Sequence, residues 1–130
     1  MPERAVVCVD DEHIILLALK SALRRELGPA FRLETATSAE SALALIAELE
    51  AIGVKTEAVV SDWLMPGMKG DELLRRLRSE RPSTCLVLLT GYADRGMVES
   101  LRREIGLEGL FSKPCDVRSV ASLLLGCLPA

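Results

Sequence analysis

Four short polar motifs in this sequence carry side chains that can do chemistry together. Each motif follows a short run of strand length within one residue: Asp10-Asp11-Glu12, Asp62, Thr90-Gly91 and Lys113-Pro114. Three carboxylates brought together raise one another's pKa unless a cation keeps them ionised. A small set of hard oxygen ligands favours Mg²⁺, so we expect Asp11 and Asp62 to bind the ion directly and Asp10 to act through water.

A phosphoryl group is the substrate that fits these side chains. Thr90 and Lys113 offer a hydroxyl and an ammonium to its oxygens, and phosphoryl transfer depends mainly on positioning and charge neutralisation. Asp62 follows the middle strand, and a carboxylate there can act as a nucleophile and form an aspartyl phosphate. We therefore predict Asp62 as the acceptor. A single aspartate after a strand is also ordinary turn chemistry, so the prediction depends on the motifs meeting at one place.

The elements that bring the motifs together are visible as alternating apolar patterns. Apolar runs of strand length occur at Ala5–Val9, Arg32–Ala36, Ala58–Ser61, Leu86–Leu89 and Leu110–Phe111. A segment with apolar residues at helical spacing follows each run: Leu16, Leu19, Leu23, Leu27; Ala39, Leu43, Ile46; Leu73, Leu74, Leu77; Met97, Val98, Leu101, Ile105; Val117, Val120, Ala121, Leu124. Strict alternation predicts an α/β fold, with a parallel sheet covered by helices on both faces. Ligands bind such sheets at the carboxyl ends of the strands, where all four motifs fall.

Local signals mark one loop and the start of two helices. Pro66-Gly67 predicts a loop after Asp62. Thr37 followed by Glu40 predicts a capping box at the start of the second helix, and Asp116 predicts the N-cap of the last helix.

Length and composition limit the class of protein. A chain of 130 residues fits one domain, residues 1–130, and with 49% apolar but only 3% aromatic residues its core must be aliphatic. The net charge of −3 argues against direct nucleic-acid binding. The apolar run near the N-terminus is too short for a signal peptide or a membrane span, so we expect a soluble cytoplasmic protein without membrane contact.

The four cysteines show no spacing typical of metal binding. Cys8, Cys85, Cys115 and Cys127 lie in or beside apolar runs, without any CxxC pair. We interpret them as buried small side chains in a reducing compartment, and we predict neither a disulfide nor a zinc site.

The four motifs, taken in order, match one known family. They are Val9-Asp10-Asp11-Glu12, Ser61-Asp62-Trp63-Leu64-Met65-Pro66-Gly67-Met68-Lys69-Gly70, Leu89-Thr90-Gly91 and Ser112-Lys113-Pro114. The set spans residues 5 to about 127, and the chain resembles the receiver domain of a two-component response regulator. The resemblance implies a flavodoxin-like, doubly wound sheet of strand order 2-1-3-4-5 with five helices.

For the site, the resemblance implies Mg²⁺-dependent transfer of a phosphoryl group to Asp62. The donor would be a phosphohistidine of a sensor histidine kinase or a phosphotransfer protein. Asp10 and Asp11 match the family's acid pair, and the backbone carbonyl of Leu64 matches the third protein ligand of the ion.

The resemblance also implies a switch that carries phosphorylation to a partner surface. Thr90 and Lys113 match the groups that contact the phosphoryl oxygens. The surface would consist of the helical segment Met97–Ile105, the strand Leu110–Phe111 and the helical segment Val117–Leu124, and it would bind a second copy or an output domain. The family's switch aromatic matches Leu110, whereas Phe111 lies one place later and should face the other side of the sheet.

Two other functions remain as alternatives. A Mg²⁺-dependent phosphohydrolase for external substrates would carry a second carboxylate two residues after its nucleophile, where this sequence has Leu64. A receiver-like interaction module that works without phosphorylation would not need the acids, Thr90 or Lys113. The displaced aromatic Phe111 keeps that second alternative open.

Several conspicuous residues have simpler explanations than catalysis. His13 is the only histidine, and we interpret it as an exposed residue in the first turn of a helix. Trp63 is expected to pack beside the site. Four arginines of the third helix are expected to form a solvated face interleaved with Glu72 and Glu80: Arg75, Arg76, Arg78 and Arg81.

Overall fold

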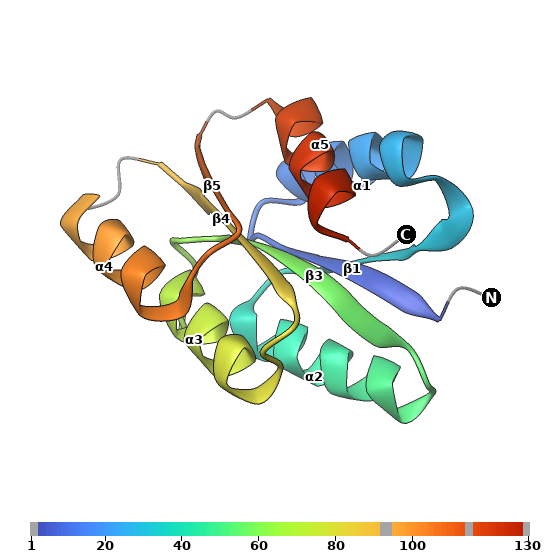
Figure 1. Cartoon of the computed structure of the whole chain (residues 1–130), viewed down its shortest axis with the longest axis horizontal. Coiled ribbons are helices and arrows are strands. Elements are labelled where there is room, and N and C mark those ends of the chain that lie inside the picture. Colours follow the sequence, from blue (N-terminus) through green and yellow to red (C-terminus); the bar gives the residue numbers. More distant parts are fainter. Residues whose placement is uncertain (1–2, 92–94, 114–115, 129–130) are drawn as a thin grey trace.

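The structure of the protein is a computed structural model that describes residues 3–91, 95–113 and 116–128 (Figure 1). Within these ranges, five strands form one parallel sheet in the order β2-β1-β3-β4-β5. The strands are β1 (Arg4–Val9), β2 (Arg32–Ala36), β3 (Lys55–Asp62), β4 (Cys85–Thr90) and β5 (Gly109–Ser112). The predicted strand order is confirmed.

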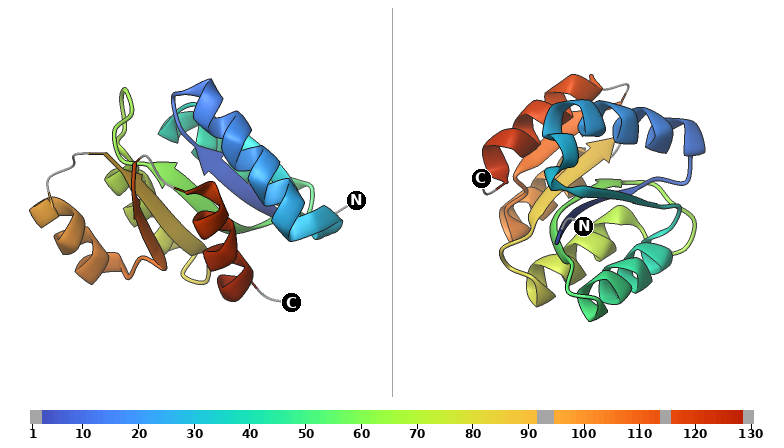
Figure 2. Two further views of the ribbon diagram at one scale, coloured as in Figure 1. Left: turned by 90° about the horizontal axis from the view of Figure 1, so that it is seen from above. Right: turned by 90° about the vertical axis from the view of Figure 1, so that its right-hand side faces the viewer.

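The helices cover both faces of the sheet (Figure 2). On one face lie α1 (His13–Leu27), which continues into the 3-10 turn η1 (Gly28–Ala30), and α5 (Val117–Cys127). On the other face lie α2 (Ala39–Ala51), α3 (Gly70–Glu80) and α4 (Arg95–Ile105). This is the doubly wound α/β arrangement that the alternation of strands and helices predicts.

Each face of the sheet has its own apolar core, because successive strand residues point to opposite sides. In β4, Leu86 and Leu88 face the core under α2, α3 and α4, whereas Val87 and Leu89 face the core under α1 and α5. Every residue of β4 is buried. A strand covered on both faces therefore reads as a continuous apolar run rather than an alternating one.

On the edge strand β5, the two neighbouring residues considered for the aromatic switch, Leu110 and Phe111, point to opposite faces of the sheet. Leu110 packs against the core of α2, α3 and α4, and Phe111 packs against the core of α1 and α5. The prediction that Phe111 faces the opposite side from Leu110 is confirmed.

The start of α2 differs from the prediction by one residue. Ser38, not Thr37, is the N-cap, and its hydroxyl accepts a hydrogen bond from the Ser41 N–H at 3.1 Å. The Ser41 hydroxyl in turn accepts from the Ser38 N–H at 3.2 Å, which completes a capping box without Glu40. Thr37 and Glu40 match the usual capping-box pattern, whereas Ser38 has Ser41 at the third helical position, so the pattern favoured the wrong residue. The Glu40 carboxylate instead accepts a hydrogen bond from the Met68 N–H.

Other local predictions hold within the described residues. Asp116 is the N-cap of α5, and its carboxylate accepts a hydrogen bond from the Arg118 N–H at 3.0 Å. His13 is the exposed first residue of α1. Among the described helices, none is both long and apolar enough to cross a membrane.

Arg78 is not part of a solvated face, contrary to the prediction. Its side chain is 19% exposed, whereas that of Arg76 is 50% exposed. The Arg78 guanidinium donates to backbone carbonyls at the end of α4 and before β4, at distances of 2.8–3.0 Å: Ile105, Gly106, Pro82 and Thr84. It also pairs with the Glu108 carboxylate at 2.6 Å. Helical spacing cannot reveal acceptors that lie 27 to 30 residues away.

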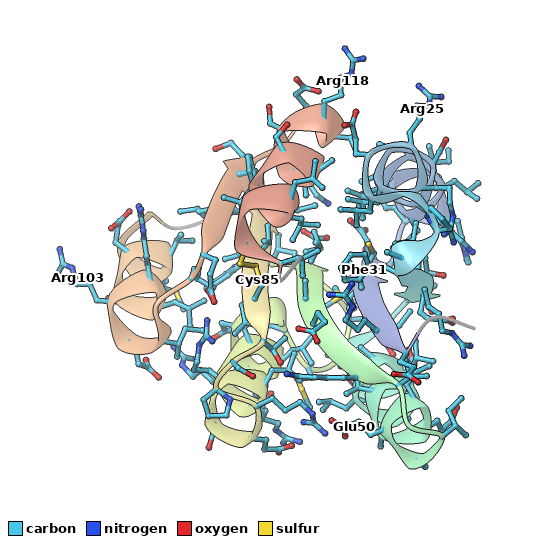
Figure 3. The ribbon with its side chains drawn as sticks, turned by 45° about the vertical axis from the view of Figure 1, so that its right-hand side comes forward. Arg25, Phe31, Glu50, Cys85, Arg103 and Arg118 are labelled. Carbon is cyan, nitrogen blue, oxygen red and sulfur yellow. A yellow bond between two sulfur atoms is a disulfide. The ribbon has the colours of Figure 1, made fainter. Side chains whose placement is uncertain are left out.

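Two of the cysteines form a disulfide, so the prediction of free thiols is wrong for this pair. Cys85 begins β4 and Cys127 ends α5, and a disulfide joins them across 42 residues (Figure 3). The spacing of cysteines could not show that α5 packs back over the start of β4. Cys8 is a buried thiol as predicted, and its burial raises its pKa to about 12. Cys115 lies outside the described residues.

Replacing Arg78 should test its role as a clamp between α3 and the end of α4. Arg78→Ala should lower the free energy of unfolding by about 2–4 kcal/mol, because several carbonyls and one carboxylate lose a charged donor. Arg76→Ala, which removes an exposed ion pair, should change it by less than about 0.5 kcal/mol. Urea unfolding followed by circular dichroism gives both values. Equal losses in the two variants would contradict the clamp.

Candidate functional site

The four motifs meet at one edge of the sheet, where the parallel strands end. Asp62 and Thr90 are the last residues of β3 and β4, while Asp10 and Lys113 directly follow β1 and β5. The Lys113 N–H donates to the Thr90 carbonyl at 2.6 Å, which keeps the ends of β4 and β5 together. The predicted convergence of these four residues on the carboxyl edge is confirmed.

The Lys113 ammonium joins two buried carboxylates. Its Nζ lies 3.0 Å from Asp10 Oδ2 and 3.1 Å from Asp62 Oδ2. Asp10 is 0% exposed and Asp62 is 5% exposed. Buried carboxylates are costly unless they are paired and hydrogen-bonded, so the lysine side chain is needed for this arrangement. It crosses from β5 to the ends of β1 and β3, which lie nearer the centre of the sheet.

Three carboxylates form an acidic cluster, Asp10, Asp11 and Asp62, that is compact enough to hold one metal ion. One ligand oxygen of each lies within 4.8 Å of the others. Asp10 Oδ1 accepts a hydrogen bond from the Glu12 N–H at 2.9 Å, which orients that carboxylate. Asp11 is exposed, so the cluster opens to solvent. Few hard oxygen donors beside solvent suit a divalent ion that keeps several of its waters.

Burial and neighbouring charges shift the acidity of the site. Burial raises the pKa of Asp62, the charge of Asp10 raises it further, and Lys113 offsets these effects only in part. Burial by itself lowers the pKa of Lys113, but its hydrogen bonds to Asp10 and Asp62 outweigh burial and the pKa is raised. Lys113 therefore keeps its proton more readily than a free lysine, and Asp62 loses its proton less readily than a free aspartate. Both shifts are what an excess of negative charge at the site produces.

Gly70 fixes the loop that follows Asp62. The Gly70 N–H donates to the Trp63 carbonyl at 3.0 Å. A β-carbon at position 70 would collide with the backbone of Asp62 and Trp63, so only glycine allows this approach. Trp63 and Met65 are buried in the core, which confirms the predicted packing of Trp63 beside the site. The Leu64 side chain is 59% exposed, and its carbonyl as a metal ligand stays a prediction.

A side chain from α2 holds the same loop, and sequence reasoning missed it. Glu40 Oε1 accepts a hydrogen bond from the Met68 N–H at 3.2 Å. Gly67, with a φ of 80°, turns the loop close to this carboxylate, and a β-carbon there would lie 3.1 Å from Glu40 Oε2. The only sequence signal for this contact was the turn at Pro66-Gly67, because Glu40 and Met68 are 28 residues apart.

The Thr90 hydroxyl is engaged by the backbone. Its Oγ1 donates to the Gly91 carbonyl at 3.0 Å, and the residue is 7% exposed. To donate to a group bound at Asp62, this hydroxyl must first leave the Gly91 carbonyl.

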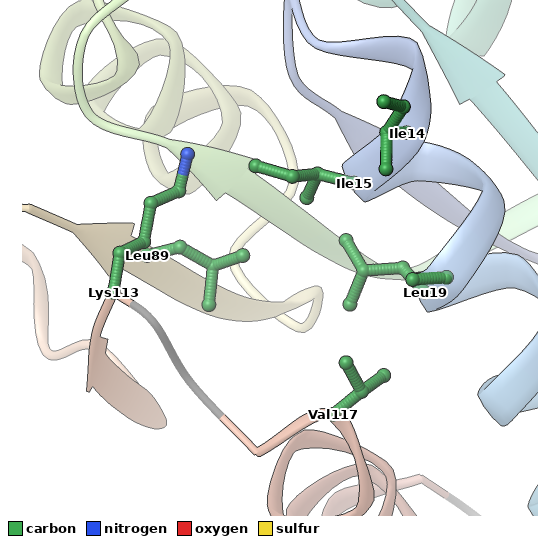
Figure 4. Close-up of a pocket in the computed structure, with 7 residues that line it drawn as sticks. Ile14, Ile15, Leu19, Leu89, Lys113 and Val117 are labelled. Atoms are coloured by element: carbon green, nitrogen blue, oxygen red, sulfur yellow. The ribbon is translucent and has the colours of Figure 1, made fainter.

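An apolar pocket of about 420 Å³ opens beside the lysine (Figure 4). Its walls come from α1, α5, the end of β4 and the lysine itself: Ile14, Ile15, Ala18, Leu19, Leu89, Lys113 and Val117. On the first turns of α1, Ile14 is 82% exposed and Leu17 is 69% exposed. An apolar surface thus borders the acidic cluster.

Several known proteins are similar to this chain. The sensor kinase CckA of Brucella abortus is 30% identical over 117 residues, which are 90% of this chain but only 12% of that kinase. Sporulation initiation phosphotransferase F of Bacillus subtilis is 24% identical over 129 residues, or 99% of this chain and 97% of that protein. A receiver domain from Clostridium thermocellum has a TM-score of 0.81 at 22% identity, covering 95% of this chain and 93% of that one, which shows the fold.

A family profile extends the similarity over most of the chain. Residues 6–124 match the family described as the response regulator receiver domain. The match includes every strand end that contributes to the site, from Asp10 after β1 to Lys113 after β5. With the strand order and the acidic cluster in agreement, the chain belongs to the response regulator receiver domain family.

Proposed function

We propose that this chain is a phosphorylation-controlled switch in which Asp62 accepts a phosphoryl group from a phosphohistidine. The observation that carries the proposal is the shared ammonium of Lys113, 3.0 Å from Asp10 and 3.1 Å from Asp62. A fixed positive charge at that point neutralises an incoming phosphoryl group beside the acceptor oxygen. Membership of the receiver family supports the same role.

The transfer needs little covalent chemistry from the protein. An Asp62 carboxylate oxygen attacks phosphorus, the new O–P bond forms, and the P–N bond to the donor imidazole breaks. The imidazole leaves with the bonding electrons and takes up a proton, while Lys113 donates hydrogen bonds to the phosphoryl oxygens. The acidic cluster and the Leu64 carbonyl would hold Mg²⁺, which when bound supplies the further positive charge that the phosphoryl group requires.

The phosphorylated state would reach a partner through β4, β5 and the helices beside them. The Thr90 hydroxyl would exchange the Gly91 carbonyl for a phosphoryl oxygen, and Lys113 would exchange part of its contact with the acids. Both residues lead directly toward α4 and α5, whose outer surfaces carry Met97, 51% exposed, and Leu125, 50% exposed. This surface of α4, β5 and α5 suits a second copy of the chain or an output domain.

The phosphodonor would dock on the first turns of α1. Ile14 lines the pocket that Lys113 borders (Figure 4) and is 82% exposed. Leu17, three residues further along α1, is 69% exposed. Large exposed apolar side chains gathered beside a polar site mark protein contact surfaces. A helix that covered this surface could place a phosphohistidine next to Asp62, so a sensor histidine kinase or a phosphotransfer protein is the partner that fits.

The two alternative functions are less well supported. A phosphohydrolase for external substrates lacks its acid, because Leu64 occupies the position two residues after the acceptor. An interaction module that works without phosphorylation does not need Asp10 and Asp62. Burying these two carboxylates costs folding free energy, which such a module would have no reason to retain. We infer that the chemistry of this chain is limited to its own phosphorylation and dephosphorylation.

Asp62→Asn should abolish the phosphoryl adduct that wild-type protein forms with acetyl phosphate and Mg²⁺, as measured by intact mass. The variant should be at least as stable as the wild type, because the raised pKa of Asp62 shows that its charge is disfavoured in the folded protein. A missing adduct would then not reflect unfolding. Asp71→Asn, in the first turn of α3, is the matched control and should keep the adduct. Equal yields from Asp62→Asn and the wild type would refute the assignment.

Mg²⁺ should bind without a phosphoryl donor and change the fluorescence of Trp63, the only tryptophan. Protons compete with the ion because the pKa of Asp62 is raised, so affinity should be highest above that pKa and fall as the pH drops through it. Below it, the loss approaches about tenfold per pH unit, since one proton is displaced for each ion bound. Asp11→Asn should weaken binding at every pH. Unchanged fluorescence together with no heat in calorimetry would count against a metal site.

Leu17→Lys should slow phosphorylation by any autophosphorylated histidine kinase that phosphorylates the wild type. The expected loss is at least about tenfold, or about 1.4 kcal/mol, because a charge would stand where the docked donor covers the leucine side chain. Phosphorylation by acetyl phosphate should be unchanged, since it needs only the acidic cluster and Lys113. Ile52→Lys alters an apolar residue that is 66% exposed but lies after α2, and it should affect neither reaction. Equal effects at positions 17 and 52 would rule out the α1 surface.

A further inference from the structure

The disulfide lies at the end of the sheet opposite to the acceptor. In the pairing of β3 with β4, Cys85 stands beside Ala58 and Leu89 stands beside Asp62. Four residues of strand therefore separate the disulfide from the site, a distance of about 13 Å. Cys85 is the first residue of β4, and Cys127 is the last residue of α5. The bond thus connects the amino edge of the sheet to the C-terminal turn of α5.

The last turn of α5 has weak local support. Gly126 lies within it, and glycine is a poor helix former. The turn contains no basic side chain to balance its free carbonyl groups. The Leu128 N–H caps the helix by donating to the Leu124 carbonyl at 2.8 Å. Beyond Leu124, the covalent bond from Cys127 to Cys85 is the strongest attachment of this turn to the sheet.

The rest of α5 does not depend on the disulfide. Val120, Ala121 and Leu124 are each 0% exposed, in the core that α5 shares with α1. Gly109 of β5 has no side chain, which lets Leu123 pack directly against that strand. The same core already holds Cys8 as a free thiol. Loss of the bond would therefore free the last turn and leave the first two turns of α5 in place.

We propose that Cys85 and Cys127 form a reversible redox pair that switches the last turn of α5 between a fixed and a mobile state. Cys127 is half-buried, whereas Cys85 is 3% exposed, so a small thiol reaches the Cys127 sulfur first. Since α5 belongs to the proposed partner surface, the redox state would change that surface; this consequence rests on the proposed function, but the thiol chemistry does not.

The exchange reaction balances with glutathione as the reductant. A glutathione thiolate attacks the Cys127 sulfur, the bond to Cys85 breaks, and Cys85 leaves as a thiolate that takes up a proton. A second glutathione thiolate then attacks the mixed disulfide and releases Cys127. Two glutathione molecules are oxidised to one glutathione disulfide, and the protein disulfide gains two electrons and two protons to become two thiols. Glutathione disulfide as the oxidant drives the reverse reaction.

The first test measures the redox pair itself. It uses a variant with Cys115→Ser, because Cys115 lies outside the described residues and its thiol would otherwise react as well. Samples equilibrated at graded ratios of glutathione to glutathione disulfide are alkylated and analysed by mass spectrometry. Cys85 and Cys127 should lose and gain alkylation together, and buried Cys8 should stay unlabelled in folded protein. The proposal is overturned if no ratio forms the bond, or if glutathione cannot reduce it.

The second test measures the last turn of α5 by hydrogen exchange in the same samples, without any phosphoryl donor. Amides of residues 125–128 should exchange at least about tenfold faster in reduced protein, because the turn opens locally. The melting temperature of reduced protein should fall by roughly 5–10 °C as the loop closed by the bond is released. Cys127→Ser should behave as reduced protein in both buffers, and Cys8→Ser should follow the redox state like the wild type.

The outcomes separate the redox pair from the phosphorylation site. Identical exchange of residues 125–128 in the two redox states would overturn the switch. Labelling of Asp62 by acetyl phosphate should agree within about twofold in the two states, because the bond is about 13 Å from the acceptor. A chain that shows the exchange difference but no labelling in either state would disprove the proposed function and leave the redox pair standing.

Discussion

The structure depends most on one arrangement of charge, two buried carboxylates that share a single ammonium. Asp62 ends β3 and Asp10 directly follows the neighbouring strand β1, so the topology of the sheet places them together whether or not their charges repel. Lys113 reaches both from β5 and makes their burial tolerable. With Asp11 included, the described residues bring three carboxyl groups to one ammonium. Carboxyl groups gathered in this way are stabilised in their ionised form by a further cation, so this edge of the sheet favours cation binding.

This charge arrangement explains the tight construction of the loop after Asp62. A carboxylate held near like charges would move away if its backbone were free, so the backbone must be fixed by contacts of another kind. Gly70 closes the loop on the carbonyl of Trp63, and the buried side chains of Trp63 and Met65 anchor it in the core. Glu40 of α2 holds its outer part through the Met68 N–H. Apolar burial and backbone hydrogen bonds thus hold the acceptor in a place that electrostatics alone would not favour.

The sequence was sufficient for the features that depend on local patterns. Strand runs, helical spacing and the polar residue at each strand end led to the correct sheet and to the convergence of Asp62, Thr90 and Lys113 at one edge. It was insufficient where a contact joins residues far apart in the chain. Arg78 looked like one more surface arginine because two of its acceptors, the Ile105 carbonyl and the Glu108 carboxylate, lie 27 and 30 residues away in the chain. Cys85 and Cys127 looked like separate apolar residues because nothing local records how α5 returns to β4.

The two ends of α5 are attached to the sheet by different physical means. At its start, the helix is capped by Asp116, three residues after Lys113, so it is close in the chain to the charged edge. At its end, Cys127 ties it to the opposite edge through a covalent bond. Between them, the buried face of Val120, Ala121 and Leu124 holds the helix on the sheet in either case. A change in charge acts on one end and a change in redox state on the other. Because the buried middle of the helix stays packed on the sheet in both cases, the last turn can loosen without moving the start of the helix.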